Sequence, residues 1–534
     1  MKIIILLLFV FTLSSCLKPK YSKETNPEKY LEFELLEDDT YAVVGFKDSY
    51  VKDLTIPSTY NNKPVTKIKE FAFKAKRSFL HLITHPPIIS LIIEEGVKII
   101  EDEAFYDAML EEVTLPSSLE YIGESAFAKN ETKINYIDNL KYIGSNAFKG
   151  NILTGEITIK NIEIGEYAFS ETLIEKVTFE DDVEIIPEGL FFNSNNLKEI
   201  NLPKNIKYIG TNAFKNTNIK EVSIFGETII DTMAFSEIES LEKVELLNKK
   251  ITLESKSFGN NINLNDINFG NIEHINPEAF SGSPLNNIKL ENSNDKYILT
   301  KEQKGIMNKS NNELILGGSN FTNFSDVKII GAYAFSQRNL GDIIIPNTVE
   351  LIKSNAFYFT SFKSLNIQAK KISYRSFYYS KINEELHIST EIISKESFYY
   401  SSGYKKLFIN EGTKKIETDA FTVVSDLETV YLPSSLEQIE MAAFVQNHNL
   451  KEVYYELPED KLPVKLYIGN FIIYKSNVVV ENNRVLTKLY DDFKIYVNEE
   501  MYDFVKDYWS DMPVNDKYIY NDNLSDFIYI RKQD

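Results

Sequence analysis

Short segments with alternating apolar and polar residues recur along most of the chain. Each is followed by a similar stretch of residues that leads the chain back to the start of the next segment. The segment "LEEVTLPSSLEYIGESAF" begins at residue 110 and places Leu110, Val113 and Leu115 at its first, fourth and sixth positions. The segment "LETVYLPSSLEQIEMAAF" over residues 427–444 has the same order. Such alternation is typical of a short strand with one buried side. We therefore expect positions one, four and six to point inward, and positions three and five to point outward.

An Ala-Phe or Ser-Phe pair, or a close variant, ends each of these segments, with regular steps of 20 to 23 residues. A fixed period of this length predicts a solenoid, with the Phe side chains as an internal ladder. The sixteen Phe residues are Phe73, Phe105, Phe127, Phe148, Phe169, Phe191, Phe214, Phe235, Phe258, Phe280, Phe335, Phe357, Phe377, Phe398, Phe421 and Phe444.

Two steps are longer than the others. The step from Phe280 to Phe335 contains an irregular insertion, residues 291–325, whose two apolar runs flank a Gly- and Asn-rich centre. This pattern predicts an inserted hairpin. The predicted fold class is thus an α/β or mostly β repeat solenoid of about 16 turns, with one parallel sheet on the concave side and capped ends.

The predicted domains follow from this period: a signal peptide over 1–15, a lipidated tether and N-terminal cap over 16–45, the solenoid over 46–455 and a C-terminal cap over 456–534. In the first cap, "YLEFELLEDDTYAVVGF" predicts a hairpin that turns at residues 37–39. In the second, Asn498 is expected to cap a short helix on which Met501, Phe504, Val505 and Tyr508 share a face.

The first residues are typical of a secretory signal: Lys2 precedes an apolar run that is too short to span a bilayer as a helix. "LSSC" then ends at Cys16, the single cysteine of the chain, and resembles a bacterial lipobox. The resemblance implies cleavage before Cys16 and attachment of the protein to a membrane by lipid on its thiol. The alternative is an ordinary signal with a chance cysteine.

The repeats resemble the BspA-type leucine-rich repeat of bacterial surface proteins. The resemblance rests on "IPSTYNNKPVTKIKEFAF" (56–73) and "LPSSLEYIGESAF" (115–127), and it covers residues 41 to about 455. It implies a cell-surface protein that adheres to host proteins, such as fibronectin or fibrinogen, or to other bacteria, without enzymatic activity. The chain departs from the family at the third residue after the Phe, where the family often has Cys and this chain has Asn130, Asn151, Thr217, Ser283, Thr360 and Asn447.

Composition and motifs exclude several functions. The net charge of −20 argues against nucleic acid and against an anionic bilayer as partner of the folded part. No nucleotide-binding loop, zinc-protease helix or nucleophile elbow occurs, so no cofactor, small-molecule substrate or catalytic residue is predicted. His81 and His85 have the four-residue spacing that suits a metal only on a helix, and the following "PP" breaks such a helix. We therefore predict no metal site.

The outward positions of the strands provide the candidate binding surface. Position three is acidic in many segments, with lysines interspersed, and its candidate binding residues are Glu112, Glu199, Glu221 and Glu452. This strip is either a solvated face or a docking strip for basic partner segments or Ca²⁺. Position five becomes aromatic towards the C-terminus, at Phe408, Tyr431 and Tyr454. Exposed aromatic residues are typical recognition anchors, so replacing these three by Ala is expected to weaken partner binding with little thermal effect.

A second group of aromatic residues follows the ladder Phe in three successive turns, at Tyr358, Tyr378, Tyr379, Tyr399 and Tyr400. These side chains either pack on the convex side or bind a partner. Taken together, the sequence predicts a lipid-anchored protein on the outer surface of a bacterial cell envelope. We expect it to bind host extracellular-matrix or other surface proteins; the alternative is a carbohydrate-binding or envelope-structural protein.

Overall fold

The structure is a computed structural model. It describes residues 22, 24–47, 50–75, 88–130, 132–134, 139–247, 250–291 and 293–456, and further on 479–481, 484–487, 494–497, 502–510, 519–520 and 528–530. Cys16, His81, His85, Asn498 and Met501 lie outside the described residues, as does the predicted signal peptide. The chain forms two compact units, Met1–Asn261 and Ile262–Asp534, which are described separately.

Each unit is a β-solenoid in which every regular turn contributes two strands, and the whole chain has about 18 turns, slightly more than the 16 predicted. The predicted strand segments form a first row of parallel strands. A second row forms from the "Tyr-Ile" or "Ile-Ile" pairs that precede the Phe, which the sequence analysis assigned to the return of the chain. The solenoid fold is therefore confirmed, and the structure adds a second sheet row to the single predicted sheet.

The first unit begins with α2 (Pro27–Tyr30) and an antiparallel pair, β1 (Leu31–Leu35) and β2 (Tyr41–Phe46), which is the predicted hairpin. The first row then contains β3 (Asp53–Ile56), β6 (Ser90–Ile93), β8 (Glu112–Thr114), β10 (Lys133–Ile134), β12 (Thr154–Ile159), β14 (Leu173–Phe179), β16 (Glu199–Asn201), β18 (Glu221–Ile224) and β20 (Lys243–Leu246). The second row contains β5 (Lys63–Ile68), with its small partner β4 (Thr59–Tyr60), then β7 (Ile99–Ile100), β9 (Tyr121–Ile122), β11 (Tyr142–Ile143), β13 (Glu163–Ile164), β15 (Ile185–Ile186), β17 (Tyr208–Ile209), β19 (Ile229–Ile230) and β21 (Ile251–Leu253).

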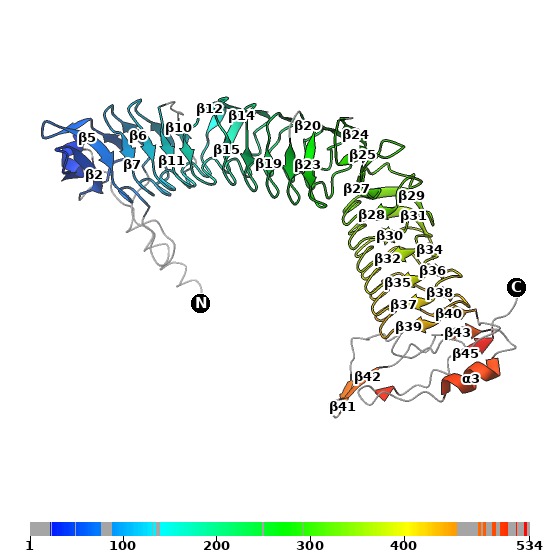
Figure 1. The fold of residues 1–534 in the computed structure, drawn as a ribbon. Helices are drawn as coiled ribbons and strands as arrows, with labels where there is room; N and C mark the ends of the chain where they lie inside the picture. The colour runs from blue at the N-terminus through cyan, green and yellow to red at the C-terminus, as the bar shows by residue number, and fades with distance from the viewer. Residues whose placement is uncertain are drawn as a thin grey trace. The chain divides into compact units, whose positions relative to one another are not determined.

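The second unit has the same two rows (Figure 1). The first row contains β22 (Asp266–Phe269), β24 (Asn287–Leu290), β29 (Asn339–Ile345), β31 (Ser361–Ile367), β34 (Leu386–Ile388), β36 (Lys406–Ile409), β38 (Thr429–Leu432), β40 (Glu452–Tyr455), β43 (Lys494–Val497) and β45 (Ile528–Ile530), with β33 (Lys381–Ile382) beside β31. The second row contains β23 (Ile272–Ile275), β28 (Ile329–Ile330), β30 (Leu351–Ile352), β32 (Lys371–Ile372), β35 (Ile392–Ile393), β37 (Lys415–Ile416) and β39 (Gln438–Ile439).

The insertion and the C-terminal region depart from the repeat. Strands β25 (Tyr297–Leu299), β26 (Gly305–Asn308) and β27 (Glu313–Gly317) pair antiparallel in that order, and β27 then joins β28 in parallel. The insertion is thus antiparallel as predicted, but the centre of the predicted hairpin is a strand, β26, that lies between the two apolar runs. The C-terminal region contains α3 (Tyr502–Ser510), near the predicted helix, with Val505 buried. A small sheet there contains β41 (Val479–Glu481), β42 (Arg484–Thr487) and β44 (Ile519–Tyr520).

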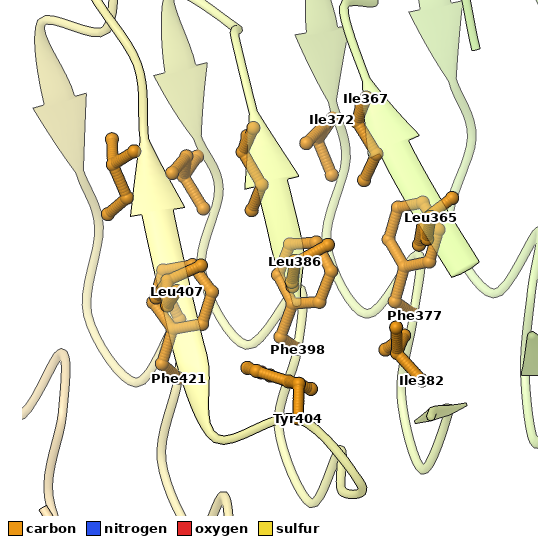
Figure 2. Packing of buried hydrophobic residues seen from close by; sticks show 14 of the residues in the cluster. Leu365, Ile367, Ile372, Phe377, Ile382, Leu386, Phe398, Tyr404, Leu407 and Phe421 are labelled. Carbon is orange, nitrogen blue, oxygen red and sulfur yellow. The ribbon is translucent and has the colours of Figure 1, made fainter. Parts of the chain in front are cut away.

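The ladder Phe side chains fill the interior, and in both units successive rings stack from Phe73 to Phe235 and from Phe335 to Phe444. All of them from Phe105 to Phe444 are among the buried core residues. In the second unit Phe357, Phe377 and Phe398 stack with ring centroids 4.8 and 4.7 Å apart and nearly parallel planes. Figure 2 shows the rings of Phe377, Phe398 and Phe421 side by side along the interior, beside the inward leucines Leu365, Leu386 and Leu407 of the first row. The inward positions follow the predicted order, since Leu110, Val113 and Leu115 are also buried.

Two residues with positive φ flank the ladder Phe in nearly every turn and let the chain fold tightly around it. Asn146 and Gly150, two residues before and after Phe148, have φ values of 56° and 77°. In this conformation backbone N–H groups reach carbonyls of the next turn, as Phe148 N does with Ala168 O at 2.9 Å. The sequence signal was the frequent Asn at these positions, since Asn adopts this region more readily than most residues.

In most turns the third residue after the Phe is a buried polar residue, and in several of them it links neighbouring turns. Asn130 donates from Nδ2 to Phe105 O at 2.7 Å and to Phe127 O at 2.9 Å, and its Oδ1 accepts from Leu110 N at 3.1 Å. Asn447 makes the same contacts with Phe421 O, Phe444 O and Val424 N. The amide therefore adds hydrogen bonds to buried backbone groups of two neighbouring turns, among them the Leu110 N–H.

Arg338 occupies this same position in the turn that follows the insertion. Its guanidinium donates from Nε to Ser283 O at 3.0 Å, from Nη2 to Phe280 O at 3.1 Å and from Nη1 to Ala334 O at 3.2 Å. Burial lowers the pKa of Arg338 to about 9, so the side chain remains a cation at neutral pH. The long side chain joins two turns that lie more than fifty residues apart in the sequence.

Candidate functional site

The aromatic residues at position five form one continuous stack of five rings on the first row of the second unit. His387, Phe408, Tyr431, Tyr454 and Tyr496 follow one another on β34, β36, β38, β40 and β43. Successive ring centroids lie 4.5, 4.4, 4.9 and 4.7 Å apart, with interplanar angles of 4° to 10°. We call these five residues the aromatic row.

The structure brings together the three predicted aromatic residues and adds one at each end. The sequence analysis did not include His387 or Tyr496 in this group. The sequence does contain a signal that places both residues at position five, because "ELHI" and "KIYV" have the same apolar alternation as "KLFI" around Phe408. The alignment of Tyr496 with Tyr454 could not be predicted, since residues 456–493 separate the two strands.

Ring faces in the aromatic row are covered and ring edges are exposed. Phe408, Tyr431 and Tyr454 each lie face to face with a ring on both sides, and all three are half-buried. An aromatic edge carries partial positive charge, whereas the face carries partial negative charge. The row therefore offers a partner C–H edges and Tyr hydroxyls rather than open ring faces.

Tyr454 is held by a neighbour at position three of its own strand. Its hydroxyl donates to Glu452 Oε2 at 3.2 Å. Burial, followed by the charge of Glu452, raises the pKa of Tyr454 to about 12. The phenol thus remains protonated and neutral at physiological pH.

Two shallow hollows adjoin the aromatic row. One, of about 300 Å³, is lined by Phe408, Tyr431 and Tyr454, with Pro433 and Glu411 among the other residues at its wall. The Glu411 carboxylate accepts from Ser434 N at 2.7 Å and Ser434 Oγ at 2.9 Å. The other hollow, of about 700 Å³, is lined in part by His387, Glu385, Lys406 and the exposed Ile344.

Lysines lie beside each of the four predicted acidic residues at position three. The register partner of Glu112 is Lys133, that of Glu199 is Lys176, that of Glu221 is Lys243 and that of Glu452 is Lys494. Lys176 Nζ lies 3.4 Å from Glu156 and 3.8 Å from Glu199. These pairs are exposed and contribute little to stability, but they offset the negative charge that a basic partner or Ca²⁺ would need. This arrangement favours the solvated-face interpretation.

Metal sites and membrane-spanning helices were also considered among the described residues. In the ranges that the structure describes, no three His, Cys, Asp or Glu side chains converge as a group able to hold a metal ion. No helix among the described residues has the length and apolar character needed to cross a membrane.

The stacked turns, the parallel strand rows and the internal Phe column define the protein as a leucine-rich-repeat solenoid. Comparison with protein families matches the family described as "BspA type Leucine rich repeat region (6 copies)" over residues 44–161, 83–198, 128–237, 185–300 and 328–451. These matches cover more than half of the chain, which therefore belongs to the BspA-type leucine-rich repeat family. None of the curated proteins matches the chain.

Solved structures with a similar fold come from several bacteria. A leucine rich cell surface protein from Faecalibacterium prausnitzii is 19% identical, with 82% of this chain and 95% of that chain covered and a TM-score of 0.32. A leucine-rich repeat protein from Bacteroides ovatus is 17% identical, with 90% and 100% covered and a TM-score of 0.38. The T. pallidum Leucine Rich Repeat protein is 21% identical, with 36% and 89% covered and a TM-score of 0.29.

Proposed function

We propose that the protein is a lipid-anchored protein of the bacterial cell surface that binds proteins of the host matrix or of other cells. Proteins of the BspA-like family are typically bacterial cell-surface proteins, which supports the location. The lipobox-like "LSSC" supports anchoring through Cys16. More than one acyl chain would hold the protein durably on the membrane.

The aromatic row is the proposed contact surface, and its stacked geometry is the observation that carries this proposal. Half-buried Phe and Tyr side chains on a rigid sheet can give up their remaining exposed area to a partner at little cost in conformational entropy. The adjoining hollow of about 300 Å³ offers room for a partner side chain.

The same geometry favours a protein over a sugar as the partner. A sugar ring stacks with its C–H groups against the face of an aromatic ring, because the partial negative charge of that face attracts their partly positive hydrogens. In the aromatic row the faces of Phe408, Tyr431 and Tyr454 are covered by neighbouring rings. The exposed edges and hydroxyls suit backbone carbonyls and apolar side chains of a polypeptide.

Replacing Phe408, Tyr431 and Tyr454 together by Ala should weaken binding to a matrix protein at least tenfold, because the edges and hydroxyls that form the contact are removed. Binding would be measured on immobilised fibronectin, fibrinogen and other matrix proteins, with a glycan array in parallel. Each lost ring stack should also lower the free energy of unfolding by about 0.5–1.5 kcal/mol. We therefore expect a moderate decrease in the thermal midpoint, whereas the sequence alone predicted almost no thermal effect.

The matched control uses the same strand position in the first unit, with Thr158, Thr178 and Asn201 replaced by Ala. These residues are polar and solvent-accessible on β12, β14 and β16, and their removal should leave binding unchanged. Equal binding by both variants, or binding to glycans alone, would refute the proposal.

A further inference from the structure

The hollow of about 300 Å³ beside the aromatic row combines apolar walls with negative charge. Three rings of the aromatic row and Pro433 form most of its apolar part, and the acidic residues Glu411 and Glu456 also line it. None of the described residues at its wall is a lysine, an arginine or a histidine. The hollow therefore differs from position three, where the four predicted acidic residues have lysines as register partners.

The two acidic residues come directly after strands of the first row. Glu411 is the second residue after the end of β36, and Glu456 is the first residue after the end of β40. Strand β38 pairs with both of these strands and lies between them. Since neighbouring strands are about 4.8 Å apart, the two backbone positions are separated by roughly 10 Å, and the hollow extends across three strands.

The charge of the hollow is not neutralised from within the described part of the chain. The Glu411 carboxylate accepts from Ser434 N and Ser434 Oγ, and neither it nor Glu456 forms an ion pair with a described residue. Burial alone would raise the pKa of Glu411, but hydrogen bonds from Ser434 and Ser435 lower it below its usual value. Glu411 is therefore an anion at physiological pH, and serine donors orient its charge without cancelling it.

We propose that this hollow receives a basic side chain, lysine or arginine, of the partner protein. The inference rests on the proposed function, because it names the kind of residue that the partner places against the aromatic row. The aliphatic stem of a basic side chain covers apolar surface while its charged end stays close to water. Here the ring edges of Phe408 and Tyr431 contact the stem, and the carboxylates of Glu411 and Glu456 attract the charged end.

Other occupants fit the hollow less well. An apolar side chain would take water away from two carboxylates without supplying a counter-charge, which is costly. An inorganic cation would leave the apolar walls uncovered, and no three acidic or His side chains of the described residues converge to hold one. The net charge of −20 also attracts basic proteins at longer range and speeds their association.

The test is fluorescence anisotropy of the lipid-free full chain with a labelled hexalysine peptide. We expect the parent protein to bind this peptide, and Glu411→Gln/Glu456→Gln to bind it at least fivefold more weakly because the counter-charge is lost. Gln has nearly the size of Glu, and its carbonyl oxygen can still accept the Ser434 hydrogen bonds. The thermal midpoint of this variant should therefore stay close to that of the parent protein.

The matched control is Glu95→Gln/Glu180→Gln, which changes the net charge by the same amount in the first unit. Glu95 is the second residue after β6 and accepts from Ser117 N at 2.9 Å, and Glu180 directly follows β14. Position five of these two strands holds Ile92 and Thr178, so the aromatic wall is missing. Hexalysine affinity of this control should stay within twofold of the parent value.

Two results with hexalysine would overturn the inference: no binding by the parent protein, or equal losses in the two double variants, which would indicate general attraction to an acidic chain. On immobilised matrix proteins, Glu411→Gln/Glu456→Gln should also bind at least fivefold more weakly. If it bound them as the parent does while the aromatic-row Ala variant did not, the inference would fail and the proposed function would stand. Site-specific hexalysine binding without any matrix-protein binding would support the basic-side-chain site and refute the proposed function.

Discussion

Replacing Phe377 by Ala is expected to lower the free energy of unfolding of the second unit by about 3–5 kcal/mol. Phe377 is fully buried and lies between Phe357 and Phe398, with ring centroids 4.8 and 4.7 Å away. The turns cannot close around the cavity, because Phe357 N donates to Ser376 O and Phe377 N donates to Ser397 O, both at 2.8 Å. Urea denaturation of the parent and variant chains would measure the loss.

Two controls define the physical origin of this effect. Phe377→Leu refills most of the volume but loses both ring stacks, so its cost should be about 1–2 kcal/mol. Ile344→Ala removes an exposed side chain and should cost less than about 0.5 kcal/mol. A Phe377→Ala variant as stable as Ile344→Ala would contradict the internal ladder.

Replacing Arg338 by Met is expected to destabilise the second unit by about 2–4 kcal/mol, because three buried carbonyls lose their charge-assisted hydrogen bonds to the guanidinium together. These are the carbonyls of Phe280, Ser283 and Ala334. Local opening of these turns can be followed by hydrogen exchange at the Gly282 amide. This amide lies in the same segment as two of the carbonyls and donates to Ser336 O at 3.1 Å. We expect this amide to lose protection before amides in the turns beyond Phe357.

The conservative control is Arg338→Lys, which retains the charge but has a single donor group in place of the planar fork. Its stability should lie between those of the parent protein and Arg338→Met. If Arg338→Met left both the unfolding free energy and the Gly282 amide unaffected, the guanidinium would have no part in joining the two turns.

Local pattern was sufficient for the repeat and its interior. The alternation around Val113, the recurrence of the Phe residues and the turn at Glu37–Asp39 are all visible within short windows, and the structure places them as expected. The second strand row was missed, because two-residue strands such as β9 and β11 are too short to produce an alternation. Backbone hydrogen bonds between neighbouring turns create these strands, and a single turn does not contain them.

The candidate surfaces depended more on tertiary structure. Position five was identifiable as outward, which located Phe408, Tyr431 and Tyr454. The sequence shows lysines interspersed among the acidic residues of position three, and the register places Lys176 opposite Glu199. Register depends on the length of each turn, so a small change in spacing alters which charges meet.

By itself, the amino-acid sequence determined the family, the period and the identity of the buried ladder, because each depends on side chains that a single turn contains. Tertiary structure alone decided that the rings of the aromatic row cover one another's faces, and that Arg338 joins the turns before and after the insertion. It also decided which Glu and Lys side chains of the first row lie opposite each other. These three features arise between turns, where stacking distance and register fix which groups meet.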